Sequence, residues 1–227
     1  MWRSRLQIQI YENILKSNDY LAEENQALFN RESIFAVGIL GSPGAGKTTL
    51  LERSVAELEK IHLRPAVLVG DLATSRDAER LQQYDIQCAQ ITTGGACHLE
   101  AQQVNKALKD FDLSQIDILF IENVGNLVCP TGFKLGEHLR TVVFSVPEGD
   151  EKVIKYPATF QKANCVVLNK IDYLELQEFD IEKPKREAQA LNPNIVWLNC
   201  SCRTGKGIDE WINYLKISKE KQFNESN

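Results

Sequence analysis

A glycine-rich loop between an apolar run and a helical stretch constrains the fold of this chain more than any other feature. Residues 41–48 fit the pattern G-x-x-x-x-G-K-[ST], after the apolar run 34–40 and before the helical stretch 47–61. Glycines let backbone N–H groups curl around phosphate oxygens, and the following helix adds its positive N-terminal end. We therefore predict a phosphate site in which Lys47 reaches the β- and γ-phosphates and the Thr48 hydroxyl binds Mg²⁺. Its predicted members are Gly41, Ser42, Pro43, Gly44, Ala45, Gly46, Lys47, Thr48 and Thr49.

Further apolar runs alternate with helical stretches along most of the chain. The runs cover residues 65–69, 116–121, 141–146, 165–168 and 195–198, and helical stretches cover 99–108 and 181–191. This alternation predicts one α/β domain over residues 33–217, an open and mostly parallel sheet with helices on both faces. Loosely helical spacing predicts a helical extension over residues 1–32, and the polar residues 218–227 predict a flexible tail.

Charge and apolar content exclude several classes of protein. The chain has 227 residues with 26 Lys and Arg against 31 Asp and Glu, a net charge of −5, so no basic stripe favours nucleic-acid binding. No apolar run approaches the ~20 residues that cross a bilayer, and residues 1–10 lack a secretory signal. We expect a cytoplasmic protein with no membrane partner, whose six cysteines are thiols or metal ligands.

Carboxylates at predicted strand ends suit a magnesium-dependent phosphate site. Asp71 and Glu122 each follow a strand, at the edge of the sheet where loops meet phosphates. Asp77 lies in the polar segment 72–80, which could be a switch. We predict that the three bind Mg²⁺ directly or through water, and that Lys47, Asp77 and Glu122 are catalytic. Alternatively, each carboxylate could be a helix cap or a solvated side chain.

A second motif predicts which base is bound. Asn169, Lys170, Ile171 and Asp172 follow the strand 165–168 and fit N-K-x-D, which reads guanine in GTPases. A carboxylate can accept hydrogen bonds from both N1–H and the 2-amine of guanine, and adenine offers neither donor. The motif could also be a polar turn at a strand exit. Ser201, Cys202 and Arg203 follow a later strand and are candidates for a supporting base loop.

Two thiols and an imidazole form a candidate metal site. Cys97 and His98 are adjacent, behind two glycines that permit a bend, and Cys129 lies seven residues beyond Glu122. Such ligands can hold Zn²⁺ or, in suitable geometry, Ni²⁺. Three ligands leave a tetrahedral site incomplete, so water or a second subunit would supply the rest. Buried thiols without a metal are the alternative.

Taken together, these segments resemble the HypB family of hydrogenase-maturation nickel GTPases, of the SIMIBI class, over about residues 34–207. The most specific segment runs from Glu122 to Pro130, where ordinary small GTPases have D-x-x-G. The resemblance implies a P-loop NTPase fold and a slow Mg²⁺-dependent GTPase that releases GDP and forms a GTP-dependent homodimer. It also implies that Cys97, His98 and Cys129 hold Ni²⁺, with Zn²⁺ able to substitute. The implied partners are a HypA-type nickel chaperone and the large-subunit precursor of a nickel–iron hydrogenase.

Several details of this resemblance stay open. Arg76 and Arg80 are candidate arginine fingers, and Lys155 could reach the nucleotide of a second subunit. Some relatives carry an N-terminal nickel motif, but residues 1–32 contain no Cys or His, so nickel delivery would rely on the cluster at Cys97. The competing functions are a urease-type nickel GTPase, an ATP-dependent small-molecule kinase and a metal-storage or redox protein.

Overall fold

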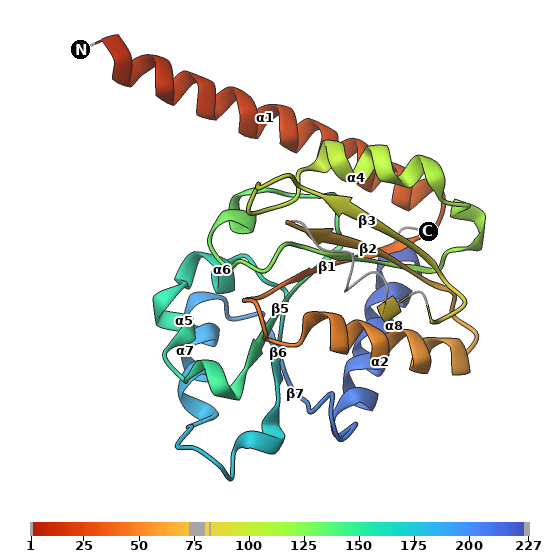
Figure 1. Ribbon diagram of the computed structural model, residues 1–227, viewed down its shortest axis with the longest axis vertical. Helices are drawn as coiled ribbons and strands as arrows, with labels where there is room; N and C mark the ends of the chain where they lie inside the picture. Colours follow the sequence, from red (N-terminus) through yellow and green to blue (C-terminus); the bar gives the residue numbers. More distant parts are fainter. Residues whose placement is uncertain (1, 73–79, 82, 225–227) are drawn as a thin grey trace.

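The computed structural model describes the backbone of residues 2–72, 80–81 and 83–224, and side chains from residue 15 onward within those ranges. Within them, one sheet has the strand order β3-β2-β4-β1-β5-β6-β7, and every neighbouring pair is parallel (Figure 1). The strands are β1 Phe35–Leu40, β2 Pro65–Asp71, β3 Gln87–Thr92, β4 Ile118–Glu122, β5 Leu139–Ser145, β6 Cys165–Asn169 and β7 Val196–Asn199.

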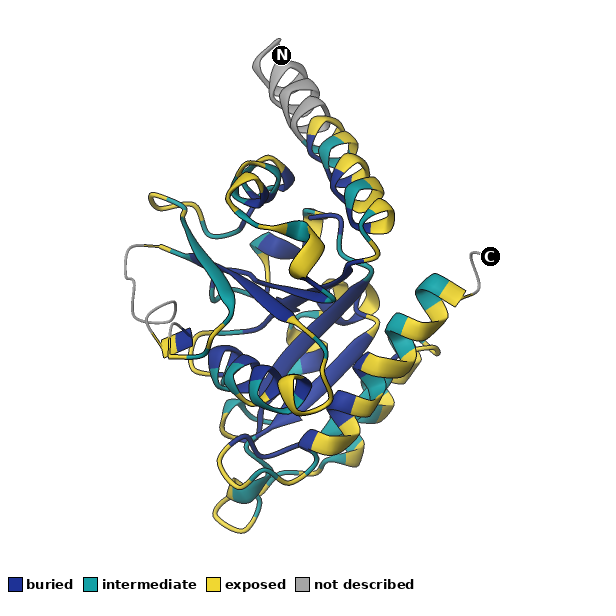
Figure 2. Ribbon diagram, turned by 90° about the vertical axis from the view of Figure 1, so that its right-hand side faces the viewer, coloured by how far each residue is buried: buried dark blue, intermediate teal, exposed yellow. Residues whose placement is uncertain are grey.

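Helices cover both faces of this sheet and bury the apolar side chains of its central strands (Figure 2). One face packs against α2 and α8, around the fully buried Trp211. The other face packs against α1 and α4 over β2, β4 and β1, and against α5, α6 and α7 over β5 and β6. The helices are α1 Trp2–Arg31, α2 Lys47–Lys60, α4 Ala101–Ala107, α5 Lys152–Lys155, α6 Pro157–Gln161, α7 Glu182–Leu191 and α8 Ile208–Asn224. Short 3₁₀ helices are η1 Leu108–Asp110, η2 Leu113–Gln115, η3 Cys129–Gly132, η4 Val146–Glu148 and η5 Ile171–Tyr173.

The predicted α/β architecture is confirmed, with local differences. The sheet is wholly parallel, and β3 was missed because its residues are only half-buried at the sheet edge and form no continuous apolar run. The irregular spacing near Asn18 does not interrupt α1, because Asn18 makes buried hydrogen bonds with the backbone of Ala101 and Lys134. Helix α8 continues through Asn224, so residues 218–224 are helical where the sequence predicted a flexible tail.

The parallel register brings the carboxyl ends of the strands to one edge. Ile39 of β1 and Val69 of β2 both pair with Glu122, the last residue of β4. Ser145 of β5 pairs with Asn169, the last residue of β6. The loops that carry the phosphate motif, the carboxylates and the base motif therefore meet at the edge where open α/β sheets bind their ligands.

Candidate nucleotide and metal site

The phosphate loop joins β1 to α2 in a conformation that its glycines permit. Gly44 and Gly46 have φ values of 77° and 96°, in the left-handed region, and Gly46 directly precedes α2. A Cβ at Gly46 would collide with the side-chain amide of Asn169. That amide donates to the carbonyl oxygen of Ala45 at 3.1 Å. The loop is thus closed against the base motif, and a side chain at Gly46 would separate the two.

A buried group of polar side chains lies behind this loop. The Thr48 hydroxyl donates to the Glu122 carboxylate, 2.9 Å from Oε1 and 3.2 Å from Oε2. Lys47 Nζ lies 3.9 Å from Glu122 Oε1 and 3.4 Å from the carbonyl oxygen of Ser42. All three side chains are less than a tenth exposed, so the cation compensates the buried carboxylate. The hydroxyl and carboxylate oxygens are ligands of the kind that Mg²⁺ prefers, and this donor set fits the ion.

A cavity of about 490 Å³ opens in front of these groups. Asp71 lies on its wall at the end of β2, where its Oδ1 accepts from the backbone N–H of Leu72 at 2.6 Å. Arg80 also lines it and donates to the Thr49 hydroxyl at 3.1 Å and to Glu52. Asp77 and Arg76, predicted for the switch, lie outside the described residues.

Lys155 does not line this cavity. Its side chain is 62% exposed and forms an ion pair at 3.0 Å with Glu151, the residue directly before α5. Reach across a dimer therefore stays a prediction for this residue.

The base motif is held in place by the two predicted loops together. Asp172 accepts from the Ser201 hydroxyl at 2.5 Å, and Arg203 Nε lies 3.1 Å from its other oxygen. Asn169 Oδ1 accepts from the backbone N–H of Cys202 at 3.1 Å. Lys170 adopts a left-handed conformation and donates to the carbonyl oxygen of Gly44 at 2.7 Å. The carboxylate of Asp172 is therefore positioned by one hydrogen bond and one ion pair, and its Oδ2 accepts no hydrogen bond from any described residue.

Sequence reasoning missed Arg53, which supports the base loop from α2. Its guanidinium donates to the carbonyl oxygens of Cys202 at 2.8 Å and Arg203 at 3.3 Å. The contact joins positions 149 and 150 residues apart, and no local pattern marks the residue. The base loop is thus bound to the helix that starts the phosphate site.

The two cysteines predicted as metal ligands lie together at the same edge, Cys97 in the loop after β3 and Cys129 at the start of η3. Hydrogen bonding to Cys129 raises the pKa of the Cys97 thiol, with burial and the charge of Cys129 adding to the shift. Cys97 Sγ lies 3.7 Å from Nδ1 of His98. Burial lowers the pKa of His98, and the ring lies against Phe133 with centroids 3.9 Å apart.

The imidazole of His98 has a further property that suits a ligand. Its Nε2 is buried and makes no hydrogen bond to any described residue, with Glu100 Oε1 the nearest acidic oxygen at 3.9 Å. A neutral imidazole and thiols are chemically suited to Ni²⁺ or Zn²⁺. However, over the described ranges no three His, Cys, Asp or Glu side chains are grouped as ligands of one ion. The side chains of Cys97, His98 and Cys129 would need to move closer together to hold a metal ion.

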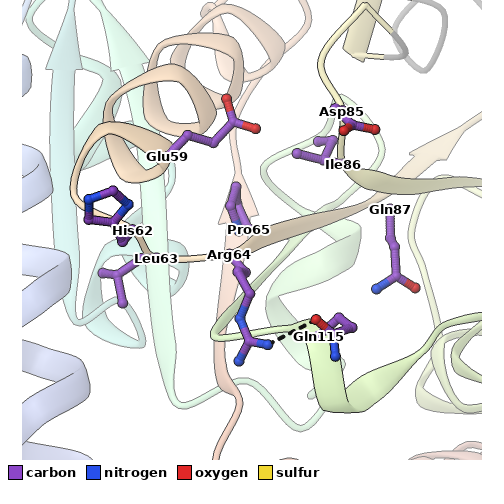
Figure 3. Close-up of a pocket in the computed structure, with 9 residues that line it drawn as sticks. All are labelled: Glu59, His62, Leu63, Arg64, Pro65, Asp85, Ile86, Gln87 and Gln115. Carbon is purple, nitrogen blue, oxygen red and sulfur yellow. Dashed lines mark hydrogen bonds between the residues drawn. The ribbon is translucent and has the colours of Figure 1, made fainter.

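A second cavity, of about 480 Å³, lies at the opposite edge of the sheet (Figure 3). It is lined by residues near the start of β2 and β3, including Arg64, whose guanidinium is held by Asp117 and Gln115. None of the predicted site residues lines it. The part of the chain that the structure describes contains no helix with the length and apolar character needed to cross a membrane.

Residues 35–199 match the family described as CobW/HypB/UreG, nucleotide-binding domain. The chain is 38% identical to the probable hydrogenase maturation factor HypB of Methanocaldococcus jannaschii, over 93% of this chain and 95% of that protein. It is 40% identical to the hydrogenase/urease maturation factor HypB of Helicobacter pylori, over 97% and 91% of the two chains. The crystal structure of Helicobacter pylori HypB in complex with nickel aligns with a TM-score of 0.85 at 38% identity, covering 91% of this chain and 97% of that one. The HypB structure from Archaeoglobus fulgidus gives 0.83 at 39% identity, with 90% and 99% covered. The chain therefore belongs to the CobW/HypB/UreG family and, within it, to the HypB hydrogenase maturation factors.

Proposed function

We propose that this chain is a GTP-hydrolysing metallochaperone that assists nickel insertion into nickel–iron hydrogenase precursors. One observation carries the proposal: a phosphate loop, a guanine motif and a pair of cysteines beside a histidine meet at one edge of the sheet. Family membership supports it, and so does the nickel complex of the Helicobacter pylori relative. The proposed location is the cytoplasm.

Hydrolysis in this proposal depends on orientation and charge neutralisation, as phosphoryl transfer to water requires. Lys47 would bind the β- and γ-phosphates from within the loop, and Asp172 would select guanine. Glu122 and Asp77 would orient the attacking water and the ligands of the metal, with Asp71 in support. Mg²⁺, when bound by Thr48 and these carboxylates, would neutralise the phosphate oxygens. Slow turnover is expected, as for a switch.

Nickel is the cargo in this proposal. Cys97, His98 and Cys129 would bind it, with Zn²⁺ as a substitute, once further closure or a second copy of the chain completes the site. Formation of a homodimer on GTP binding is part of the proposal, with Lys155 reaching the partner's nucleotide. A HypA-type chaperone would supply the metal, and the hydrogenase large-subunit precursor would receive it.

A urease precursor is the second candidate client. It is favoured by the relative from Helicobacter pylori, which is described as a hydrogenase/urease maturation factor. By contrast, the LAO/AO transport system kinase aligns at only 18% identity, and that likeness extends to the fold alone. Nickel-dependent activation of each purified precursor distinguishes the two clients.

The direct test compares GTP and ATP binding and hydrolysis by the unmodified chain with nickel binding by the same preparation. We expect Mg²⁺-dependent hydrolysis of GTP in preference to ATP, and Ni²⁺ binding that is lost in Cys97→Ser and Cys129→Ser. Cys165→Ser is the matched control, because that thiol is fully buried within the core. A preference for ATP, or nickel binding unaffected by the first two substitutions, contradicts the proposal.

A further inference from the structure

We infer that Asn123 is a positioning residue that connects the nucleotide pocket to the Cys97–His98 part of the metal cluster, an inference that rests on the proposed function. Its amide oxygen accepts two backbone hydrogen bonds, from Leu99 at 2.9 Å and from Val124 at 3.0 Å. The side chain is buried, with 2% of its surface exposed. The bond to Leu99 spans 24 residues of sequence and reaches the residue directly after His98.

The nucleotide end of this connection is short. Asn123 directly follows Glu122, whose carboxylate accepts from the Thr48 hydroxyl in the phosphate loop. Its own backbone N–H donates to the carbonyl oxygen of Ile39 in β1, at 2.9 Å. A displacement of the Glu122 backbone on loss of the γ-phosphate would therefore act directly on the residue that also holds Leu99.

The metal end is fixed by packing as well as by that hydrogen bond. Leu99 is fully buried, and its side chain fills the space at Gly70, where an added Cβ would come within 2.8 Å of it. Gly70 precedes Asp71 at the end of β2. The backbone that carries Cys97 and His98 is thus anchored, through Leu99, to the ends of the two strands whose carboxylates line the nucleotide pocket.

Cys129 is anchored to the other side of the same pocket. Asn126 accepts with its Oδ1 from the backbone N–H groups of Val128 at 2.7 Å and Cys129 at 3.4 Å. The backbone of Asn126 forms an isolated antiparallel bridge with Gly41, the first residue of the phosphate loop. The two sulfur atoms therefore depend on different anchors, and movement of Asn123 relative to Gly41 changes how closely they approach.

Two sites are energetically coupled when each ligand stabilises a different arrangement of a shared element. Here the shared element is the segment from Glu122 to Cys129, and Asn123 is the member that extends its movement to Cys97 and His98. Loss of the Asn123–Leu99 hydrogen bond leaves the nucleotide-binding and metal-binding residues in the chain but removes this connection between the two sites.

The test is a Ni²⁺ titration by calorimetry of the full chain, loaded with Mg²⁺ and either GDP or a non-hydrolysable GTP analogue. In the unmodified chain we expect the two nickel dissociation constants to differ by at least fivefold. Asn123→Ala is expected to bring them within about twofold of each other. Asn123→Ser provides a second variant should the first fail to fold, because its hydroxyl can serve the adjacent Val124 but is too short to reach Leu99.

Asn25→Ala is the matched control. Asn25 is also fully buried and makes two hydrogen bonds to backbone carbonyls, those of Ala101 and Leu135, but it lies on α1 and its side chain makes no hydrogen bond to the segment from Glu122 to Cys129. Asn25→Ala should keep the ratio of the two nickel dissociation constants found for the unmodified chain. If Asn123 had a purely structural role, Asn123→Ala would give the same result as Asn25→Ala. Retention of the ratio in the Asn123 variants overturns the inference, as do equal constants in the unmodified chain. Failure of the unmodified chain to bind nickel or GTP at all refutes the proposed function itself.

Discussion

Asp172→Ala tests the guanine site, and its effect can be estimated from the chemistry of the carboxylate. A hydrogen bond of 2.5 Å from Ser201 and an ion pair of 3.1 Å with the exposed Arg203 orient this carboxylate without the nucleotide, and its Oδ2 accepts no hydrogen bond from a described residue. Guanine presents two donors to it, N1–H and the 2-amine. A hydrogen bond to a charged group contributes about 1.5–3 kcal/mol. Two such bonds give about 3–6 kcal/mol, a preference for GTP over ATP of roughly 10²–10⁴.

The assay is competition of GTP and ATP against a fluorescent guanine nucleotide, at fixed Mg²⁺. Asp172→Ala should weaken GTP binding by roughly 10²–10⁴-fold and leave ATP affinity nearly unchanged. Ser201→Ala should give an intermediate loss, because Arg203 still holds the carboxylate. Asp209→Ala, an exposed carboxylate on α8, serves as the control and should behave like the unmodified chain.

Asp172→Asn should change which base the protein prefers. An amide can accept from N1–H of xanthine and donate to its 2-carbonyl oxygen, so this variant should prefer xanthosine triphosphate to GTP. The assignment of Asp172 is refuted if Asp172→Ala keeps the selectivity of the unmodified chain for GTP over ATP. Such a result would place the base elsewhere on the sheet edge.

Three further predictions concern phosphate binding, packing and acid stability. Lys47→Ala should weaken GTP by about 10–150-fold through loss of one charge-assisted contact, and unchanged binding in the same titration would exclude the phosphate site. Trp211→Phe should lower the free energy of unfolding by about 1–3 kcal/mol in urea, since it removes a buried 2.8 Å hydrogen bond to Ser54; a change below about 0.5 kcal/mol would contradict this. Burial lowers the pKa of His138 from 6.5 to about 4, so the unfolded chain binds the proton first as pH falls. Stability contributed by the neutral ring should therefore be lost between pH 6.5 and about 4, by at most about 3 kcal/mol and less with solvent screening, and His138→Asn should flatten this part of the pH profile.

Local motifs in the sequence were sufficient to predict where the loops of the candidate nucleotide site lie. The residues of the phosphate loop are contiguous, and the pattern needs only a strand before it and a helix after it, which β1 and α2 supply. The base motif was equally readable, because a polar tetrad follows the buried strand β6. The pairing of Cys97 with Cys129, 32 residues apart, required the family resemblance, since the spacing alone is typical of no metal site.

Contacts that join distant segments could not be predicted in the same way. Asn25 is a polar residue on a helix, and its burial against Ala101 and Leu135 depends on how α1 crosses the sheet. Arg53 is an exposed helix residue, and its hydrogen bonds to the base loop depend on how that loop packs on α2. The edge strand β3 has no continuous apolar run because one side of it lacks a neighbouring strand. In each instance the tertiary arrangement decides the role of the residue.

The juxtaposition of the two sites has a thermodynamic consequence that does not depend on which residue connects them. If GTP changes the affinity for nickel by some factor, nickel must change the affinity for GTP by the same factor. The segment from Glu122 to Cys129 reaches both the phosphate loop and the cysteine pair, so it is the element through which either ligand would act on the other. On one preparation, calorimetry should therefore give the same ratio for nickel affinity with and without GTP as for GTP affinity with and without nickel. Unequal ratios would mean that the protein also changes its state of association during the titration, which a homodimer formed on GTP binding would produce.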